Sequence, residues 1–439
     1  MSHNVKYINS NDFENEVLIS KIPVIVDFFS DDCAPCEILA PILEKMADKY
    51  SGHIKFVKIL RQDNRELANS LNVSSSPTLM FFKDGNEIGT RLNGFMNKPQ
   101  VRMAIEEILG DVLPKEEIKN VECDVLILGA GAAGLSAGIY SSRAKMKTVI
   151  LDESVPGGQT AATYQVENYP GTPGAVKGKE IIENMRDQVI SFGGQIDDLK
   201  EIYEVNLTEK IKSVQTEDTI YYAKSVIIAS GAVPRSLPAD GADEFKGKGV
   251  HYCATCDGSM YQDRKIVVIG GGISAAEEAI FLTRFASHVT IINKYDKFKE
   301  NQHNEDILNN PKIDVIWNSI VKKVNGKGYA LTSVEVENRD TKEISEIPTE
   351  GAFVYIGAEP KSKLYEGQID INDWGYILTD EYMQTDLEGV FSAGDIREKE
   401  IRQVITAASD GAVAGIMAGK YLENNKIEFK MFAEVSRKA

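Results

Sequence analysis

The chain has little cysteine and tryptophan, and acidic residues outnumber basic ones. Only five of its 439 residues are cysteine and two are tryptophan. A small secreted domain held together by disulfides carries far more cysteine per residue, so that class of protein is excluded. The net charge of −17 disfavours nucleic acid and anionic membranes as partners.

Long apolar runs are also missing. No stretch reaches the length of a transmembrane helix, and the first residues, MSHNVKYINSNDFENEV, lack the basic and apolar regions of a signal peptide. We therefore expect a cytoplasmic protein. Its 439 residues predict two or three domains, and an apolar content of 43% is ample for their cores.

Four of the cysteines form two CxxC pairs, Cys33 with Cys36 and Cys253 with Cys256. In a cytoplasmic protein this motif indicates redox chemistry or metal binding. The two pairs are too far apart for a zinc ribbon, and Pro35 is unlike a zinc knuckle, so we predict redox centres and no metal site. The fifth cysteine, Cys123, opens an apolar strand, and we interpret it as buried filler.

Two glycine fingerprints indicate dinucleotide sites. The first, GAGAAG (129–134), lies between an apolar strand at 124–129 and a helix, and the next strand ends at Asp152. Such a turn lets the backbone and the helix N-terminus approach a pyrophosphate, while a carboxylate accepts hydrogen bonds from ribose hydroxyls. The second fingerprint, GGGISA (270–275), follows a strand at 265–270 and carries alanine at its last glycine position.

Residues 1–111 resemble thioredoxin over the whole segment. The expected order is β-CxxC-α-β-α-β-β-α, with strands at 24–29, 54–59 and 79–82 and a last helix at 101–109. The matching positions, besides the cysteines, are Asp27, Pro41, Lys58, the expected cis-proline Pro77 and Gly94. The chain departs from the family at Asp32, usually tryptophan, and at Ala34, usually glycine.

A polar linker is predicted at 112–120, and from 121 onward the chain resembles a low-molecular-weight thioredoxin reductase. The motifs are GAGAAGLSAGIY, PGGQ (156–159), ENYPG (167–171), GKGVHYCATCDG, GVFSAGDI (389–396) and RQVITAASDG (402–411). The resemblance implies an α/β protein with two Rossmann-like domains after the thioredoxin fold, and a homodimer. It implies an FAD-binding domain at 121–235 and 356–439, and an inserted pyridine-nucleotide domain at 236–355 that carries CATC.

The resemblance also implies site residues. Those expected at FAD are Gly129, Gly131, Ala132, Ala133, Gly134, Asp152, Glu153, Gly158, Gln159, Asn168, Gly231, Gly394, Asp395, Arg402, Gln403 and Val404. Those expected at NADP or NAD are Gly270, Gly272, Ser274, Ala275, Lys294 and Lys299. Because the insert carries both the nucleotide turn and CATC, we expect it to rotate about segments near 233–249 and 352–358.

The expected electron path ends on the first CxxC. Cys256 is the flavin-side cysteine, Cys253 attacks the thioredoxin disulfide, and Asp257 is the acid. Cys33, placed before a helix start that stabilises its thiolate, then attacks a target disulfide. Cys36 resolves the mixed disulfide, with Asp27 as proton shuttle and Pro77 beside the pair.

The electron donor is the open question. The family usually has Asp at Ile273 and an arginine pair after the next strand, where this chain has Asn293-Lys294-Tyr295. Without the arginine fork we expect weak use of NADPH or NADH. Ferredoxin-linked flavin thioredoxin reductases also lack those arginines. The tail IEFKMFAEVSRKA (427–439) would cover the flavin in such a protein, although we favour a frayed terminus.

Two alternatives stay open. One is the flavoprotein subunit of a hydroperoxide reductase, which reduces a peroxiredoxin, but that family carries two thioredoxin-like modules in tandem and this chain has one. The other is a flavin-dependent redox sensor without turnover, which the intact CATCDG motif (253–258) disfavours.

Overall fold

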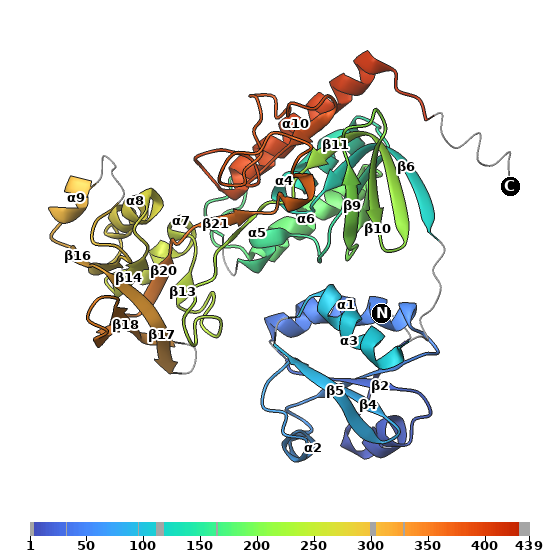
Figure 1. Ribbon diagram of the computed structural model, residues 1–439, viewed down its shortest axis with the longest axis horizontal. Coiled ribbons are helices and arrows are strands. Elements are labelled where there is room, and N and C mark those ends of the chain that lie inside the picture. The colour runs from blue at the N-terminus through green and yellow to red at the C-terminus, as the bar shows by residue number, and fades with distance from the viewer. Residues whose placement is uncertain are drawn as a thin grey trace.

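The computed structural model describes residues 4–31, 33–94, 96–110, 118–163, 166–298, 304–327 and 330–429. Figure 1 shows three groups of sheets, and each group has its own helices. We name them the N-terminal unit (4–110), the central unit built on the seven-stranded sheet, and the inserted unit built on β13 to β20. The predicted α/β fold class is confirmed.

The N-terminal unit is a five-stranded sheet in the order β1-β3-β2-β4-β5 with helices on both faces. Its strands are β1 (Val5–Tyr7), β2 (Val24–Phe29), β3 (Lys55–Leu60), β4 (Thr78–Lys83) and β5 (Asn86–Asn93). Its helices are η1 (Ser10–Asp12), η2 (Glu14–Leu18), α1 (Ala34–Lys49), α2 (Arg65–Ser70) and α3 (Lys98–Leu109). The apolar runs at 24–29, 54–59 and 79–82 form the buried strands as predicted, whereas the short β1 carries no apolar run and was not predicted.

The central unit is a seven-stranded sheet with α4, α6 and α10 stacked beside it (Figure 1). Its strands are β6 (Lys119–Leu128), β7 (Thr148–Leu151), β8 (Gln195–Asp197), β9 (Ile202–Asn206), β10 (Lys212–Thr216), β11 (Thr219–Ile228) and β22 (Val390–Ser392). Its helices are α4 (Ala132–Arg143), α5 (Gly158–Ala162), α6 (Gly178–Ser191) and α10 (Val404–Asn425). The sheet begins at Lys119, which pairs with Thr219, so the last two residues of the predicted linker 112–120 are strand; residues 111–117 lie outside the described part of the chain.

The two ends of the reductase-like region meet in this unit. β22 pairs in parallel with β11, and α10 lies along α4, where the Ser136 hydroxyl donates to the carbonyl of Ala408 at 2.6 Å. Gly411 permits this approach, because a Cβ there would lie 2.0 Å from the Ala133 carbonyl oxygen. The C-terminal motifs are thereby brought to the first glycine turn.

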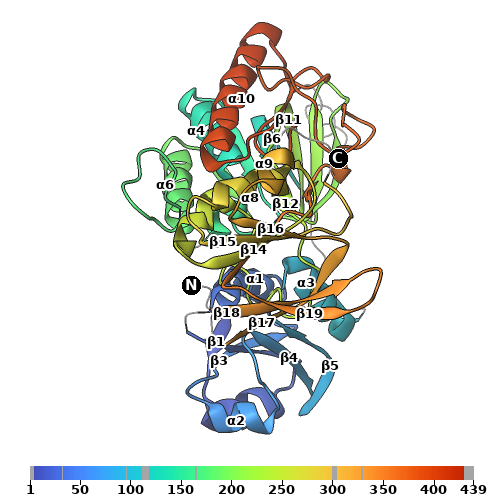
Figure 2. The ribbon, with the colours of Figure 1, turned by 90° about the vertical axis from the view of Figure 1, so that its left-hand side faces the viewer.

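The inserted unit combines a five-stranded parallel sheet, β13-β20-β14-β15-β16, with a three-stranded antiparallel one. Its strands are β13 (Val250–His251), β14 (Lys265–Ile269), β15 (His288–Ile292), β16 (Ile313–Ile316), β17 (Ser319–Lys327), β18 (Ala330–Asn338), β19 (Ile344–Pro348) and β20 (Gly351–Val354). Its helices are α7 (Ala254–Asp257), η3 (Gly258–Tyr261), α8 (Ile273–Leu282) and α9 (Asn304–Leu308). The antiparallel pair β12 (Ala232–Pro234) and β21 (Ala358–Pro360) lies where the chain enters and leaves it, before η4 (Lys363–Tyr365), and Figure 2 shows the unit from its exposed side.

None of the described helices combines the length and the hydropathy that a membrane crossing requires.

Candidate active site

The first CxxC lies at the start of α1. Cys33 is the N-cap residue of this helix and forms a disulfide with Cys36, whose backbone N–H donates to the Cys33 sulfur at 3.3 Å. The Cys33 sulfur is 3.6 Å from the carbonyl oxygen of Ser76, and the Ser76–Pro77 peptide is cis, as the sequence predicts. A helix N-terminus stabilises a thiolate, so this end of α1 favours thiol–disulfide exchange.

Asp27 is a buried acid on β2, the strand that leads to this CxxC. Its side chain is 2% exposed, and its Oδ2 lies 3.4 Å from Nζ of Lys58. Within the described part of the chain, neither carboxylate oxygen has a hydrogen-bond partner. Burial, opposed by Lys58, raises the pKa of Asp27 to about 6. A carboxyl group with this pKa exchanges protons near neutral pH.

The first glycine turn leaves its backbone open on one side. Gly129 has φ +112°, and a Cβ on Gly134 would lie 1.8 Å from the Gly129 carbonyl oxygen, so neither position accommodates a side chain. A Cβ on Gly131, at the start of α4, would meet no described atom within 4 Å. Asp152 holds the turn from β7, because its Oδ2 accepts the Ala130 N–H at 2.6 Å. The open face at Gly131 fits a pyrophosphate.

The C-terminal segment supplies polar groups to the same region. The Asn168 amide donates to Oε1 of Gln403 at 3.0 Å, joining residues that are 235 positions apart. Oδ1 of Asp395 and Nε of Arg402 are buried and, among the described residues, have no hydrogen-bond partner, although Oδ1 of Asp395 lies 3.7 Å from Nζ of Lys399. Buried polar atoms are normally satisfied, so these two orphans fit a polar ligand such as FAD. Burial raises the pKa of Asp395 against the charges of Lys399 and Arg402.

The other predicted flavin positions lie on the same elements. Ala132 and Ala133 begin α4, Gly158 and Gln159 begin α5, Val404 begins α10, Glu153 follows β7, Gly231 follows β11, and Gly394 follows β22. A Cβ on Gly394 would lie 2.7 Å from the Cβ of Ala133, which shows how closely the two motifs approach.

Three residues of this region were not predicted from the sequence. Asp410 accepts the Gly394 N–H at 3.1 Å and pairs with Lys399 at 2.9 Å. The Arg402 guanidinium lies 4.3 Å from the ring centroid of Tyr376. Asp410 belongs to the motif at 402–411, which was the available signal, whereas nothing local pointed to Lys399 or Tyr376.

The second CxxC lies at the start of α7. Cys253 is disulfide-bonded and is the N-cap residue of this helix, and the Ala254 N–H donates to the Tyr355 hydroxyl at 2.6 Å. The Cys256 side chain lies outside the described atoms, so its pairing with Cys253 stays a prediction. Asp257 ends α7 and contacts His251, a residue that the sequence analysis missed.

A half-buried glutamate, Glu278, accompanies this redox centre. Burial and the neighbouring Glu277 raise the pKa of Glu278 on α8 to about 7. Burial, with the charge of Glu278, raises the pKa of Tyr355, whose hydroxyl holds the start of α7. Neither Glu278 nor Tyr355 was singled out from the sequence.

The second glycine turn is formed, but its surroundings differ from a typical nucleotide site. Gly270 has φ +150°, and α8 begins at Ile273 and contains Ser274 and Ala275, while a Cβ on Gly272 would meet no described atom within 4 Å. Asn293 takes the place after β15 where the family places charged residues. It is fully buried, accepts the Tyr295 N–H at 3.0 Å and donates to the Lys297 carbonyl at 3.2 Å.

The two predicted lysines add little to this nucleotide site. Nζ of Lys294 lies 5.6 Å from the ring centroid of Tyr295, and Lys299 lies outside the described residues. Ile273, where the family has an acid, is 48% exposed at the helix start. Among its described residues, 293–298, the loop after β15 carries Lys294, Asp296 and Lys297 and no arginine.

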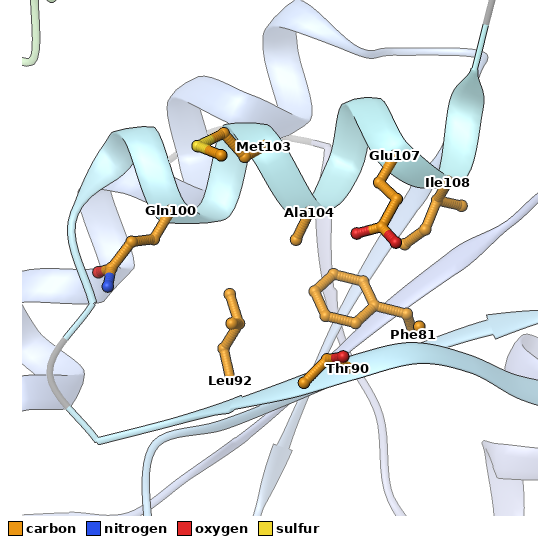
Figure 3. Close-up of a pocket in the computed structure, with 9 residues that line it drawn as sticks. Phe81, Thr90, Leu92, Gln100, Met103, Ala104, Glu107 and Ile108 are labelled. Carbon is orange, nitrogen blue, oxygen red and sulfur yellow. The ribbon is translucent and has the colours of Figure 1, made fainter.

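An apolar pocket on the N-terminal unit takes no part in this chemistry. It lies between α3 and β5 and is lined by Phe81, Leu92, Met103, Ala104 and Ile108, among others (Figure 3). The described residues hold no group of three or more His, Cys, Asp or Glu side chains arranged for a metal.

Two family models cover nearly the whole chain. Residues 4–107 match thioredoxin, and residues 123–411 match pyridine nucleotide-disulphide oxidoreductase. Thioredoxin reductase of Peptoclostridium acidaminophilum is 44% identical over 309 residues, which are 69% of this chain and 98% of that protein. A 34.2 kDa protein in the rubredoxin operon of Clostridium pasteurianum is 43% identical over 69% of this chain and 97% of its own length.

Solved structures of thioredoxin reductases are also similar to this chain. The crystal structure of thioredoxin reductase from Streptococcus pyogenes is 36% identical, with a TM-score of 0.66 over 70% of this chain and 100% of that one. Thioredoxin reductase from Giardia duodenalis gives a TM-score of 0.65 at 31% identity over 69% of this chain. The chain therefore belongs to the thioredoxin reductases of the pyridine nucleotide-disulphide oxidoreductase family and carries a thioredoxin domain at its N-terminus.

Proposed function

We propose that this flavoenzyme reduces its own N-terminal CxxC, which then reduces disulfides of other proteins. The observation that carries the proposal is that one chain holds two disulfide-bonded redox cysteines, Cys33 and Cys253, each at the N-cap of a helix. Asp27 lies on the strand before the first pair, and Asp257 ends the helix of the second. Detection of dithiol-dependent insulin reduction, with any electron source, tests this function.

The central unit would hold FAD, and the bound flavin would supply two-electron chemistry between an electron donor and the second CxxC. The turn at Gly129, Gly131 and Gly134 would hold its pyrophosphate. Asp395 and Arg402 would satisfy their orphaned polar atoms on its polar groups. We propose that the central unit is the FAD-binding domain, at 121–235 and 356–439, and that 236–355 rotates as the inserted domain.

Thiol exchange between the two cysteine pairs then proceeds in two steps. The Cys253 thiolate attacks the sulfur of Cys33, and the Cys33–Cys36 bond breaks with Cys36 leaving as the thiolate. Cys256 next attacks the sulfur of Cys253, which restores that disulfide and releases Cys33 as the thiolate. The N-terminal pair gains two electrons, and the inserted pair loses two.

Protons follow the thiolates through two carboxyl groups. Asp257 supplies or accepts a proton at the inserted pair, where His251 holds its carboxylate. Asp27, whose pKa is raised to about 6, protonates the leaving thiolate in the N-terminal unit. Thiolates formed in a buried site need such a partner, because burial disfavours charge.

The donor is proposed from the loop after β15. With Asn293 buried and no arginine among residues 293–298, we propose weak reduction by NADPH or NADH with little preference, or reduction by ferredoxin. Arginine contacts to a 2′-phosphate contribute about 1.5–3 kcal/mol each, so loss of two arginines with the lysines retained should lower the preference for NADPH by roughly ten- to a hundredfold. The test is an anaerobic titration of the oxidised flavin with NADPH, NADH and reduced ferredoxin in parallel. Rapid reduction by micromolar NADPH, with NADH inert, would overturn the donor assignment.

The partners are disulfide-containing proteins in a reducing compartment, the cytoplasm, with a peroxiredoxin among the candidates. We propose a homodimer, as implied by the family. Sedimentation of the flavin-loaded chain measures this directly, and a monomer at micromolar concentration would contradict it.

A further inference from the structure

We propose that the loop 198–201 of the central unit is a built docking site for the chain's own N-terminal unit, which stays bound there in solution. The loop connects β8 to β9 and faces helices α1 and α3 of the N-terminal unit (Figure 1). Two independent features support the proposal. One is the insertion of an apolar side chain of this loop into the N-terminal unit, and the other is a set of buried ion pairs between the two units.

Leu199 forms the apolar part of the site. Its side chain is 1% exposed and belongs to the core cluster of the N-terminal unit, together with Leu43, Met46 and Ile105 of α1 and α3. Its backbone has φ +55°, a left-handed conformation that leucine rarely adopts. Such a conformation persists where the surroundings fix it, so this leucine is placed to insert between the two helices.

Opposite charges surround this leucine. Lys98 on α3 is 4% exposed and donates to the Leu199 carbonyl at 2.5 Å, and it also pairs with Glu217. Arg102, one helical turn later, donates to Glu201 at 3.0 Å, and Glu201 is 6% exposed. The N-terminal unit contributes the cations and the central unit the acids. Charges buried to this degree are tolerated only with their partners in place, so the two surfaces complement each other.

Ion pairs at the rim extend the contact on both sides. Lys45 on α1 pairs with Asp198 at 2.5 Å, and Lys179 on α6 pairs with Glu37 at 3.2 Å. Glu37 directly follows Cys36, so the start of α1 lies at the edge of the docked surface. The opposite face of α3, which carries Gln100, Met103 and Glu107, lines the pocket of Figure 3 and is left out of the contact.

Every residue that pairs with the N-terminal unit in this dock belongs to the central unit, and none to the inserted unit. Rotation of the inserted unit would therefore leave the N-terminal unit in place. If the proposed function holds, the N-terminal pair is a fixed acceptor to which Cys253 is brought. The docking itself does not depend on that electron path.

Solution scattering of the flavin-loaded full chain tests the dock without turnover. The test variant is Leu199→Asp, which places a charge in the apolar core. The matched control is Lys200→Ala in the same loop, because Lys200 pairs with Asp218 inside the central unit at 2.6 Å. We expect a compact wild type and control, and a larger radius of gyration with a broader distance distribution for Leu199→Asp.

Reversing the charges of the Arg102–Glu201 ion pair provides a second test of the dock. Glu201→Lys should expand the chain, and Arg102→Glu added to it should restore the compact form, because the ion pair is re-formed with reversed signs. Retained flavin absorption and circular dichroism show that each variant is folded. An expanded wild type, or a compact Leu199→Asp variant that is folded, would overturn the docking proposal and leave the proposed electron path untouched.

Discussion

His251 and Asp257 are joined by a contact of 3.1 Å between Nδ1 of the imidazole and Oδ2 of the carboxylate. The other ring nitrogen lies 2.7 Å from the Tyr261 hydroxyl, and the ring stacks on Phe353 with centroids 5.3 Å apart. This buried Tyr–His–Asp chain holds the carboxylate that ends the Cys253 helix. It makes His251 a positioning residue for the proposed acid.

Removal of this imidazole should slow thiol exchange and alter its pH dependence. In His251→Leu the carboxylate of Asp257 loses its orienting partner, and we expect about a tenfold slower transfer to the N-terminal pair, a fraction of the ~10²–10⁴ that a general acid provides. The measurement is stopped-flow transfer as a function of pH. His251→Gln, which keeps a donor, is the conservative control and should recover part of the rate. A His251→Leu variant with the wild-type pH profile would show that the contact is structural only.

The buried carboxyl group of Asp27 should make the N-terminal unit less stable at high pH. Burial raises its pKa from 3.8 to about 6, so the folded state holds its proton more tightly than the unfolded state. The resulting stabilisation is full below pH 3.8 and is lost as the pH rises through about 6, amounting to about 3 kcal/mol over that window.

Asp27→Asn should remove this pH dependence, because the amide does not titrate. The measurement is the urea midpoint of N-terminal peptides in pulse proteolysis of the full chain at pH 4 and pH 8. The control is the double variant Asp27→Asn with Lys58→Met, which also removes the lysine that pairs with Asp27 at 3.4 Å. Equal pH dependence in wild type and Asp27→Asn would contradict the raised pKa.

Substitutions at the first glycine turn should separate flavin binding from folding. Gly131→Val places its side chain in space that no described atom occupies, so we expect a folded, colourless protein. Gly134→Ala meets a backbone oxygen at 1.8 Å and should disturb the turn itself. Flavin absorbance per chain and circular dichroism distinguish the two. Gly272→Val, at the open position of the second turn, is the control and should retain FAD; stoichiometric flavin in Gly131→Val would refute the assignment.

Removal of both resolving cysteines should trap the transfer intermediate. In Cys36→Ser with Cys256→Ser, a Cys33–Cys253 disulfide has no thiol to displace it. Peptide mapping after oxidation should find this link, and its yield should not fall on dilution, because both thiols belong to one chain. The matched control, Cys33→Ser with Cys256→Ser, retains Cys36, which is 6% exposed and should not form the link. Exclusive joining of Cys33 to external proteins would show that the N-terminal unit is not reduced by its own chain.

The local elements and the chemistry of the motifs followed from the sequence. The apolar runs at 24–29 and 265–270 predict buried strands, and the first CxxC pair lies at a helix N-terminus as the sequence predicts. Glycine turns are also local, because a backbone at φ +112° at Gly129 requires that residue type. These features depend on side-chain periodicity and conformational preference within a few residues.

Only the tertiary structure decided which distant residues meet. The Asn168 amide donates to Gln403, and the Asp257 carboxylate contacts the imidazole of His251. Nothing in the sequence around β13 singled out this histidine. Leu199 has the sequence neighbours of an ordinary polar loop, and Lys98 has those of an exposed helix start. Both are nevertheless buried, because they face each other. Burial of such residues arises from contacts between segments about 100 positions apart, and no pattern within either segment records the partner.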